Sequence, residues 1–310
     1  MVVDVTEWLL DSDPAIRWQV MRDLTDEPAD VVAAERARVA TEGWGARLLA
    51  LQGADGQWGG GTYSPKWIST TYTLLLLRLL GLDPASTQAR AAVERVREGV
   101  RWQRRSSGPY FAGETETCVN SMVVALGAYF GEHGPEQQRL REWLLGEQLD
   151  DGGWNCESPA RSTRSSFNTT ILALEGLLQV EQSAGVDPVI AAARTRGEEY
   201  LLERRLFRSL TTGAVVSPTW RLFSFPPQWH YDVLRGLEYF RAAGAPPDPR
   251  CGEAIDLVRE RRRTDGRWPL QHTHRARTHF PMEDGDGKPS RWNTLRALRV
   301  LRWYEHGTVG

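Results

Sequence analysis

Residues 147–157, EQLDDGGWNCE, contain the pattern that decides the fold. A glutamine is followed by an Asp-Gly step, and a tryptophan comes shortly after that step. Asp-Gly favours a tight turn, because the aspartate side chain accepts a hydrogen bond from nearby backbone and glycine adopts positive φ without strain. The stretch therefore predicts the sharp end of one element and the start of the next.

The same pattern recurs along the chain. Residues 51–60, LQGADGQWGG, repeat all three features, and residues 261–270, RRRTDGRWPL, keep the Asp-Gly step and the tryptophan but carry Arg262 where the glutamine should be. Residues 102–111, WQRRSSGPYF, look like a degenerate copy. Repetition at a spacing of tens of residues is typical of a fold built from one repeated supersecondary unit.

The segments that flank each turn alternate in character. An arginine-rich segment such as 86–103 precedes a turn, and its apolar residues recur every three to four positions, which predicts a half-buried helix. A segment that is apolar almost all round, such as 70–82, follows a turn, which predicts a helix buried on every side. No segment alternates as a strand would.

Six such pairs can be counted. We expect outer helices near residues 2–10, 29–51, 86–104, 136–148, 188–205 and 249–263, and inner helices near 14–24, 67–80, 117–130, 166–182, 228–243 and 291–304. This order predicts an all-α single domain over residues 1–310, an (α/α)6 barrel or toroid with six inner and six outer helices. An open solenoid is the alternative, but it would need polar end repeats. We expect the long loops 206–227 and 269–290 to form a lid over one mouth.

Composition narrows the class of protein. The chain has 310 residues and a formal net charge of −2, which does not predict a nucleic-acid partner. Three cysteines and a start without a signal-peptide pattern lead us to expect a cytoplasmic protein without disulfides. The longest apolar run is too short for a transmembrane segment. Thirteen tryptophans indicate either heavy packing demands or an aromatic-walled cavity.

The Gln…Asp-Gly-x-Trp turns resemble the repeats of squalene and oxidosqualene cyclases, which share their toroid with the β subunits of protein prenyltransferases. The resemblance is sharp at 51–60, 147–157 and 261–270. It implies structural roles for the residues Gln52, Trp58, Gln148, Trp154 and Trp268. It also implies an isomerase or lyase that acts on a small, largely apolar, isoprenoid-derived molecule. The Asp-x-Asp-Asp motif that donates the proton in triterpene cyclases is absent, and the chain has the length of one toroid only.

In such a toroid the first-turn residues of the inner helices, with the adjoining loops, would line the cavity. The candidate substrate-binding residues are Trp18, Thr71, Cys118, Asn120, Cys156, Asn168, Trp229, Tyr231, Trp292 and Asn293. They combine aromatic walls with a few polar groups, as small-molecule pockets do. The alternative for the Thr, Asn and Asp residues at helix starts is a capping role without any function in binding.

Three residues are the candidates for acid-base chemistry. Asp232 is the favoured acid, supported by His230 and by Glu157 in the loop after the second full turn motif. The alternatives are a helix cap for Asp232, a core histidine for His230 and a solvated loop carboxylate for Glu157. Arg161 and Arg164, in the same loop as Glu157, could meet an anion.

Other functions stay open at this stage. A zinc site of the prenyltransferase kind would use Glu116, Cys118 and His230, although Cys118 also suits a small buried apolar position. No cofactor is favoured. A non-catalytic binding or scaffold toroid, and a carbohydrate-active enzyme without its paired carboxylates, are further alternatives. The last loop carries histidines and acids whose spacing fits no metal pattern: His272, His274, His279, Glu283, Asp284 and Asp286.

Overall fold

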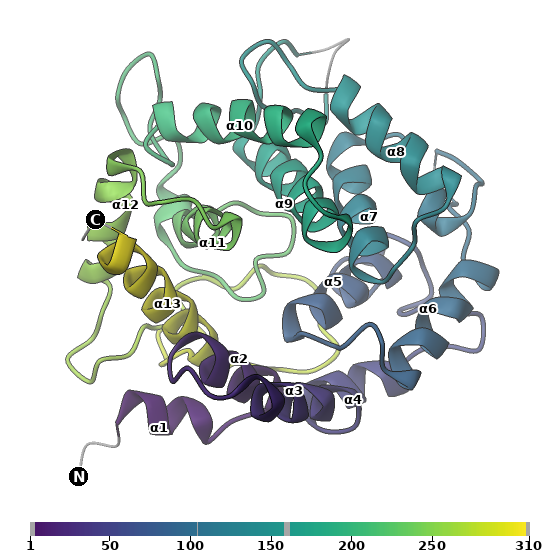
Figure 1. Cartoon of the computed structure of the whole chain (residues 1–310), viewed down its shortest axis with the longest axis horizontal. Helices are drawn as coiled ribbons and strands as arrows, with labels where there is room; N and C mark the ends of the chain where they lie inside the picture. The colour runs from purple at the N-terminus through teal and green to yellow at the C-terminus, as the bar shows by residue number, and fades with distance from the viewer. Residues whose placement is uncertain (1–3, 104, 158–161, 308–310) are drawn as a thin grey trace. The chain divides into compact units, whose positions relative to one another are not determined.

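The computed structural model describes residues 4–103, 105–157 and 162–307. The described residues form α-helices, short 3-10 helices and loops, and the only β pairing among them is in isolated bridges (Figure 1). The prediction of an all-α protein is confirmed. No helix in this part of the chain has the length and apolarity needed to cross a membrane.

Helices in the predicted outer positions are α1 (Val5–Leu10), α3 (Ala29–Ala37), α4 (Gly43–Ala50), α6 (Thr87–Gly99), α8 (Pro135–Gly146), α10 (Pro188–Glu203) and α12 (Gly252–Glu260). Helices in the predicted inner positions are α2 (Pro14–Asp23), α5 (Thr70–Leu80), α7 (Thr117–Tyr129), α9 (Phe167–Ala184), α11 (Val233–Ala243) and α13 (Arg291–Gly307). The predicted positions of the helices along the chain are confirmed, because these bounds follow the expected ranges closely.

Two predicted helices differ from the structure. The range 29–51 is interrupted between α3 and α4, where Gly43 has a φ of +62° and the backbone N–H of Trp44 donates to Asp13 Oδ2 at 2.7 Å. The range 228–243 becomes helical only at Val233, because Asp232 caps the helix.

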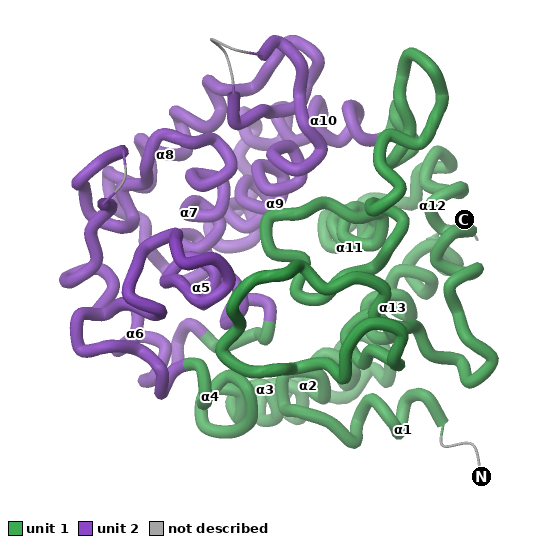
Figure 2. Tube along the Cα trace, turned by 180° about the vertical axis from the view of Figure 1, so that it is seen from behind, with its two compact units in different colours: residues 1–48, 80–83, 202–310 green, residues 49–79, 84–201 purple. Residues whose placement is uncertain are grey.

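The chain forms two compact units, shown in different colours in Figure 2: residues 1–48, 80–83 and 202–310 make unit 1, and residues 49–79 and 84–201 make unit 2. In unit 1, α13 packs against α2, α11 and α12, and α2 also packs against α1 and α3. In unit 2, α7 packs along α9 and against α8. The closed ring of six pairs stays a prediction.

The repeated turns share one set of hydrogen bonds. The backbone N–H of the turn tryptophan donates to a threonine hydroxyl in the first turn of the following inner helix. The three pairs are Trp58 with Thr70 at 3.2 Å, Trp154 with Thr170 at 3.0 Å, and Trp268 with Thr294 at 3.0 Å. All three indole rings are fully buried. Each turn is therefore tied to the helix that follows it.

The same turns are also tied to outer helices. The indole N–H of Trp154 donates to the Leu144 carbonyl at 2.9 Å, and that of Trp268 donates to Val258 at 2.7 Å. Gln52 donates to the carbonyls of Gly56 and Ala92, at 3.0 and 2.9 Å.

Gln148 makes the matching pair of bonds, to Gly152 at 2.6 Å and Ala193 at 2.8 Å. Ala92 and Ala193 belong to the next outer helix in each case, α6 and α10. The structural roles implied for Gln52, Trp58, Gln148, Trp154 and Trp268 are confirmed.

The cysteines correct one expectation. Cys118 and Cys156 form a disulfide with Cα atoms 5.7 Å apart, within the usual range for such a bond, so the expectation of a chain without disulfides is wrong. Cys251 is a free, buried thiol, and burial raises its pKa to about 12. The bridge joins the first turn of α7 to the loop after the second full turn motif, both in unit 2.

The two long loops of unit 1 are joined to each other. Ser224 and His272 form a parallel bridge. The Gln271 N–H donates to the Phe223 carbonyl at 3.0 Å, and the Phe223 N–H donates to Gln271 Oε1 at 3.2 Å. These contacts place the residues around Ser224 beside those around His274.

Candidate functional site

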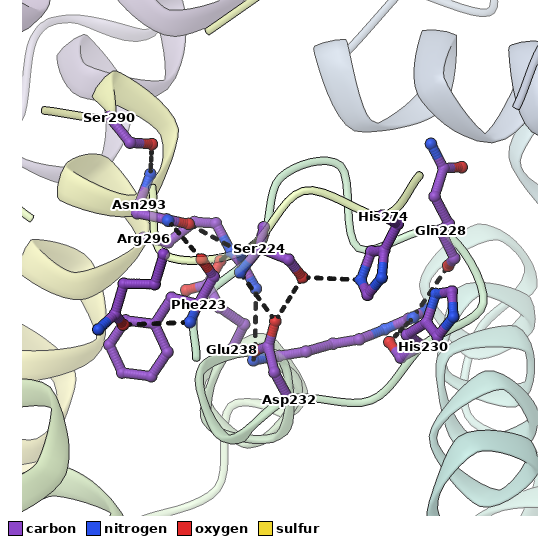
Figure 3. A network of polar contacts seen from close by, with 12 residues as sticks. Phe223, Ser224, Gln228, His230, Asp232, Glu238, His274, Ser290, Asn293 and Arg296 are labelled. Carbon is purple, nitrogen blue, oxygen red and sulfur yellow. Dashed lines mark hydrogen bonds and ion pairs between the residues drawn. The ribbon is translucent and has the colours of Figure 1, made fainter. Parts of the chain in front are cut away.

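The predicted site residues fall into both units. Trp18, Trp229, His230, Tyr231, Asp232, Trp292 and Asn293 belong to unit 1, whereas Thr71, Cys118, Asn120, Cys156, Glu157 and Asn168 belong to unit 2. Within unit 1, the structure gathers most of the polar candidates around the starts of α11 and α13 (Figure 3). Trp18 lies elsewhere in the unit: its indole N–H donates to the Leu80 carbonyl at 3.0 Å and the guanidinium of Arg22 lies over its ring.

Asp232 is the N-cap of α11 and is 2% exposed. Its Oδ1 accepts from the Arg235 N–H at 2.8 Å, and its Oδ2 accepts from the Ser224 hydroxyl at 3.0 Å and the Ser224 N–H at 3.3 Å. The guanidinium of Arg296 lies 3.9 Å from Oδ1. Both oxygens are thus used in holding the local structure, which fits the capping alternative for this residue.

The Ser224 hydroxyl also lies 3.1 Å from Nε2 of His274, so it stands between that imidazole and Asp232 (Figure 3). Because the hydroxyl gives its proton to Asp232, Nε2 is assigned as the donor in the contact with Ser224. Burial is the main cause that lowers the pKa of His274 to about 4, with a further contribution from His272, so this imidazole is neutral at pH 7.

His274 belongs to a stack of three aromatic rings, together with His230 and Trp229. Its ring stacks on that of His230 with centroids 3.7 Å apart, and the His230 ring stacks in turn on the Trp229 indole at 3.8 Å. The carbonyls of Gln228 and His230 accept from the Arg235 guanidinium at 3.0 and 2.7 Å. His230 is therefore a packed member of a ring stack, and the loop that carries it is fixed by α11.

Asn293 and Arg296 link α13 to the loops. The Asn293 amide donates to the carbonyls of Phe223 and Pro269, each at 3.1 Å, and the buried Arg296 guanidinium donates to the Ser224 carbonyl at 3.0 Å. Asn293 is fully buried. These contacts give Asn293 a positioning role for both long loops.

Trp292 belongs to an aromatic group at the start of α13. Its ring stacks on Phe225 with centroids 4.4 Å apart and 8° between the planes, and Trp44 lies at 6.2 Å. The Trp292 indole N–H is buried and has no hydrogen-bond partner among the described residues. A buried donor without a partner is costly, so this N–H is suited to an acceptor from outside the chain.

Glu283 lies beside this aromatic group. Its Oε1 accepts from the Ser290 hydroxyl at 2.6 Å and from the backbone N–H of Trp292 at 3.3 Å, whereas Oε2 has no hydrogen-bond partner within the described residues. Burial raises the pKa of the Glu283 carboxyl to about 7, and Asp284 adds to the rise, while the two hydrogen bonds and Arg291 oppose it. A carboxyl whose pKa is raised in this way is partly protonated near neutral pH, so it can act as a general acid there.

The candidates in unit 2 have structural contacts. Thr71 donates to the Thr62 carbonyl at 2.7 Å and accepts from the Tyr110 hydroxyl at 2.9 Å, and Asn120 closes a loop by two hydrogen bonds to the backbone of Glu114. Cys156 contacts the Thr169 hydroxyl at 3.3 Å. Asn168 is half-buried in the first turn of α9.

Glu157 and Arg164 are exposed, and Arg161 lies outside the described residues. Unit 2 also contains a cavity of about 190 Å³ between Tyr63, Trp102 and Glu114. Glu157 is therefore an exposed loop residue, whereas the predicted catalytic residue Asp232 is buried.

The structure gives the zinc alternative no support. Cys118 is bonded to Cys156 and offers no thiolate, and Glu116 pairs with Arg105 at 3.0 Å. Across the described residues, no three His, Cys, Asp or Glu side chains come close enough to hold a metal ion, and this holds for the histidines and acids of loop 269–290.

Three residues of the site were not singled out by the sequence. Ser224 and Arg296 have no local motif, because their roles depend on partners far away in the chain. Glu283 was noted only among the loop acids. A signal for Glu283 does exist, since an acid that precedes a serine and an apolar helix start is suited to accept the free N–H groups there.

No protein-family model and no curated protein matches the chain. Among solved structures, the chain is similar to the type II terpene cyclase MstE from Scytonema without ligand, at 17% identity over 94% of this chain and 88% of that one, with a TM-score of 0.43. A variant of MstE in complex with geranylgeranyl dihydroxybenzoate, its substrate, is similar at 18% identity over 98% and 87% of the two chains, with a TM-score of 0.44. These matches extend over nearly the whole chain.

Proposed function

We propose that this protein is a cyclase-like enzyme that protonates a carbon–carbon double bond of a small, largely apolar, isoprenoid-derived molecule, with Glu283 as the proton donor. The observation that carries the proposal is the position of the Glu283 carboxyl. Oε1 accepts both of its hydrogen bonds. One of them comes from the backbone N–H of Trp292, the residue whose ring stacks on Phe225. The resemblance of the turn motifs to those of triterpene cyclases implies the isoprenoid class.

The chemistry suits a weakly acidic carboxyl in partly buried surroundings. Oε2 gives its proton to one alkene carbon, the π electrons form the new C–H bond, and the other alkene carbon becomes cationic. A second double bond of the same molecule then supplies electrons for ring closure. Loss of a proton from a neighbouring carbon ends the reaction, so the overall change is an isomerisation that needs no oxidant or reductant.

The aromatic group supports the cationic stage. The faces of Trp and Phe rings attract cations, by about 2 kcal/mol or more where water is excluded. Trp292 is 1% exposed and Phe225 is 4% exposed, so both rings lie in such surroundings. The Trp292 indole N–H, which lacks a partner within the described residues, suits an oxygen acceptor on the substrate, such as a hydroxyl group.

Asp232 has a structural role in the proposed enzyme and is not the proton donor. With its oxygens committed to Ser224, Arg235 and Arg296, it is a positioning residue for the start of α11 and for His274. His230 and Tyr231 belong to the same scaffold, since the Tyr231 hydroxyl donates to the Leu206 carbonyl at 2.7 Å.

The test uses deuterium as a label. The purified protein is incubated with farnesol, geranylgeraniol or squalene in D2O, and the products are analysed by gas chromatography and mass spectrometry. We expect an isomer that carries one deuterium on carbon. Farnesol and geranylgeraniol should react better than squalene, because they offer an oxygen to the Trp292 N–H.

Variants identify the donor. Glu283→Gln should lower the rate by about 100-fold or more, because general acid catalysis contributes that much. Glu260→Gln, which alters an exposed carboxyl on α12, is the matched control and should keep the wild-type rate. Labelled product at an unchanged rate in Glu283→Gln would remove Glu283 as the acid, and no labelled product from any of the three compounds would contradict the proposed reaction.

A further inference from the structure

A second feature of unit 1 lies at the opposite end of α13 from Glu283. An open groove of about 700 Å³ lies among the last turns of α2, α11 and α13, and we call it the arginine groove. Its basic side chains are Arg22, Arg241, Arg299, Arg302 and His306, and its acids are Asp23 and Asp26. Trp292 and His306 are fourteen positions apart on α13, which is about 20 Å along the helix, so the groove is separate from the proposed catalytic end.

Most of the cations in the groove have partners. Arg299 donates to both oxygens of the buried Glu238, with its Nε at 2.9 and 2.8 Å. Arg22 makes a bidentate pair with Asp23, at 2.6 and 2.8 Å.

Arg302 pairs with Asp26 and donates to the Asp23 carbonyl at 2.9 Å. Basic side chains near helix C-termini are also expected on general grounds, because the last carbonyls attract them. These residues alone therefore do not mark a binding site.

Arg241 is less completely paired than the other arginines of the groove. Its guanidinium makes one hydrogen bond, from Nε to Glu238 Oε1 at 3.3 Å, and that oxygen already accepts from Arg299. Within the described residues, neither terminal nitrogen of Arg241 has a hydrogen-bond partner. Burial lowers the pKa of Arg241, and the neighbouring Arg299 and Arg22 add to the effect while Glu238 and Asp23 oppose it. The groove therefore holds a guanidinium whose charge its neighbours do not fully balance.

We propose that the arginine groove binds a phosphate or diphosphate group, with the terminal nitrogens of Arg241 as its main donors and Arg302 and His306 at its rim. A guanidinium presents parallel N–H donors that match phosphate oxygens, and an anion there balances the excess of positive charge. The volume is in the range of small-molecule sites. The group can belong to a soluble phosphate compound or to a lipid headgroup, because the chemistry that recognises it is the same.

Calorimetric titration tests the proposal. Sodium phosphate and sodium diphosphate are titrated into the full-length protein at constant ionic strength. We expect saturable binding at one site per chain, tighter for diphosphate, and at least tenfold weaker in Arg241→Gln. The matched control is Arg259→Gln, which removes an exposed arginine on α12 outside the groove and should bind as the wild type does.

Sedimentation with vesicles separates the two sources of the group. Vesicles of phosphatidylcholine are compared with vesicles that also contain phosphatidic acid. Binding to the second kind alone, lost in Arg241→Gln, would support the proposal with a lipid headgroup as the ligand, and saturable titration by diphosphate would support it with a soluble one.

Three results would overturn the proposal. They are no saturable binding of phosphate, diphosphate or phosphatidic acid, unchanged binding in Arg241→Gln, and equal weakening in Arg241→Gln and Arg259→Gln. Circular dichroism and urea unfolding show whether each variant is folded. If Arg241→Gln does not fold, Arg302→Gln replaces it, and we then expect a several-fold loss of affinity from the rim of the groove.

Discussion

The imidazole rings of His230 and His274 lie parallel, with centroids 3.7 Å apart and 7° between their planes. This stack connects the segment before α11 to the loop 269–290. The Ser224 hydroxyl forms hydrogen bonds with both His274 and Asp232. Because burial and the neighbouring His272 disfavour a charged His274, the stability of this arrangement depends on pH.

Acidification should weaken the folded state through His274. Burial lowers its pKa from 6.5 to about 4, so between these values the unfolded chain binds more protons than the folded one. The free energy of unfolding therefore falls as the pH falls through this window. His274→Gln should lessen that fall, as measured by urea unfolding at several pH values. His272, Asp232, Arg235 and His230 face His274, and an unchanged slope in the variant would show that another group causes the dependence.

Glu283 should act in the opposite direction. Its pKa rises from 4.5 to about 7, so in this window the folded chain binds more protons and stability falls as the pH rises. Glu283→Gln removes this loss of stability, which amounts to about 3 kcal/mol over the whole window, so above about pH 7 the variant should gain stability relative to the wild type. The same ionisation should lower kcat/KM of the proposed reaction as the pH rises above about 7. Glu260→Gln, which alters an exposed carboxyl on α12, is the matched control, and an identical slope in Glu283→Gln and the wild type would contradict the shift.

Asp232 provides a test of capping against catalysis. Asp232→Ala removes the N-cap of α11, the acceptor of the Ser224 hydroxyl and one of the two carboxylates near the buried Arg296, which should cost about 1–3 kcal/mol. Asp232→Asn keeps an acceptor for the Arg235 N–H and should cost clearly less. Urea unfolding measures both. If both variants are as stable as the wild type, the structural role is wrong.

The glutamine of the turn motif can be tested in the same way. Gln148→Ala removes the hydrogen bonds to Gly152 and Ala193, and each such bond is worth about 1 kcal/mol. We therefore expect a loss of about 1–2 kcal/mol in the free energy of unfolding. Gln138→Ala, at an exposed position on α8, is the control and should change stability by less than about 0.5 kcal/mol. Equal effects in the two variants would show that the turn does not need its glutamine.

The helices could be predicted from the sequence because their signals are local. Apolar spacing and Asp-Gly turns locate the helices to within a few residues, apart from the break at Gly43. That break depends on Asp13, thirty positions earlier, which accepts the Trp44 N–H. A pattern confined to one helix does not contain such a contact.

The site was predicted less completely for the same reason. Asp232 and Asn293 were singled out from their positions at helix starts, and both lie in the polar network of unit 1. Ser224 and Arg296 join that network only through the folded loops. The bond between Cys118 and Cys156 spans thirty-eight positions, and an odd number of cysteines gave no reason to pair these two.

The tryptophan–threonine bond recurs although the chain between its ends varies in length. The separation is 12 positions for Trp58 and Thr70, 16 for Trp154 and Thr170, and 26 for Trp268 and Thr294. Insertions at these places thus leave the helical frame intact. The loops between these tryptophans and threonines can therefore change in length and sequence during evolution or design, and a new ligand preference can arise in them while the helices stay unchanged.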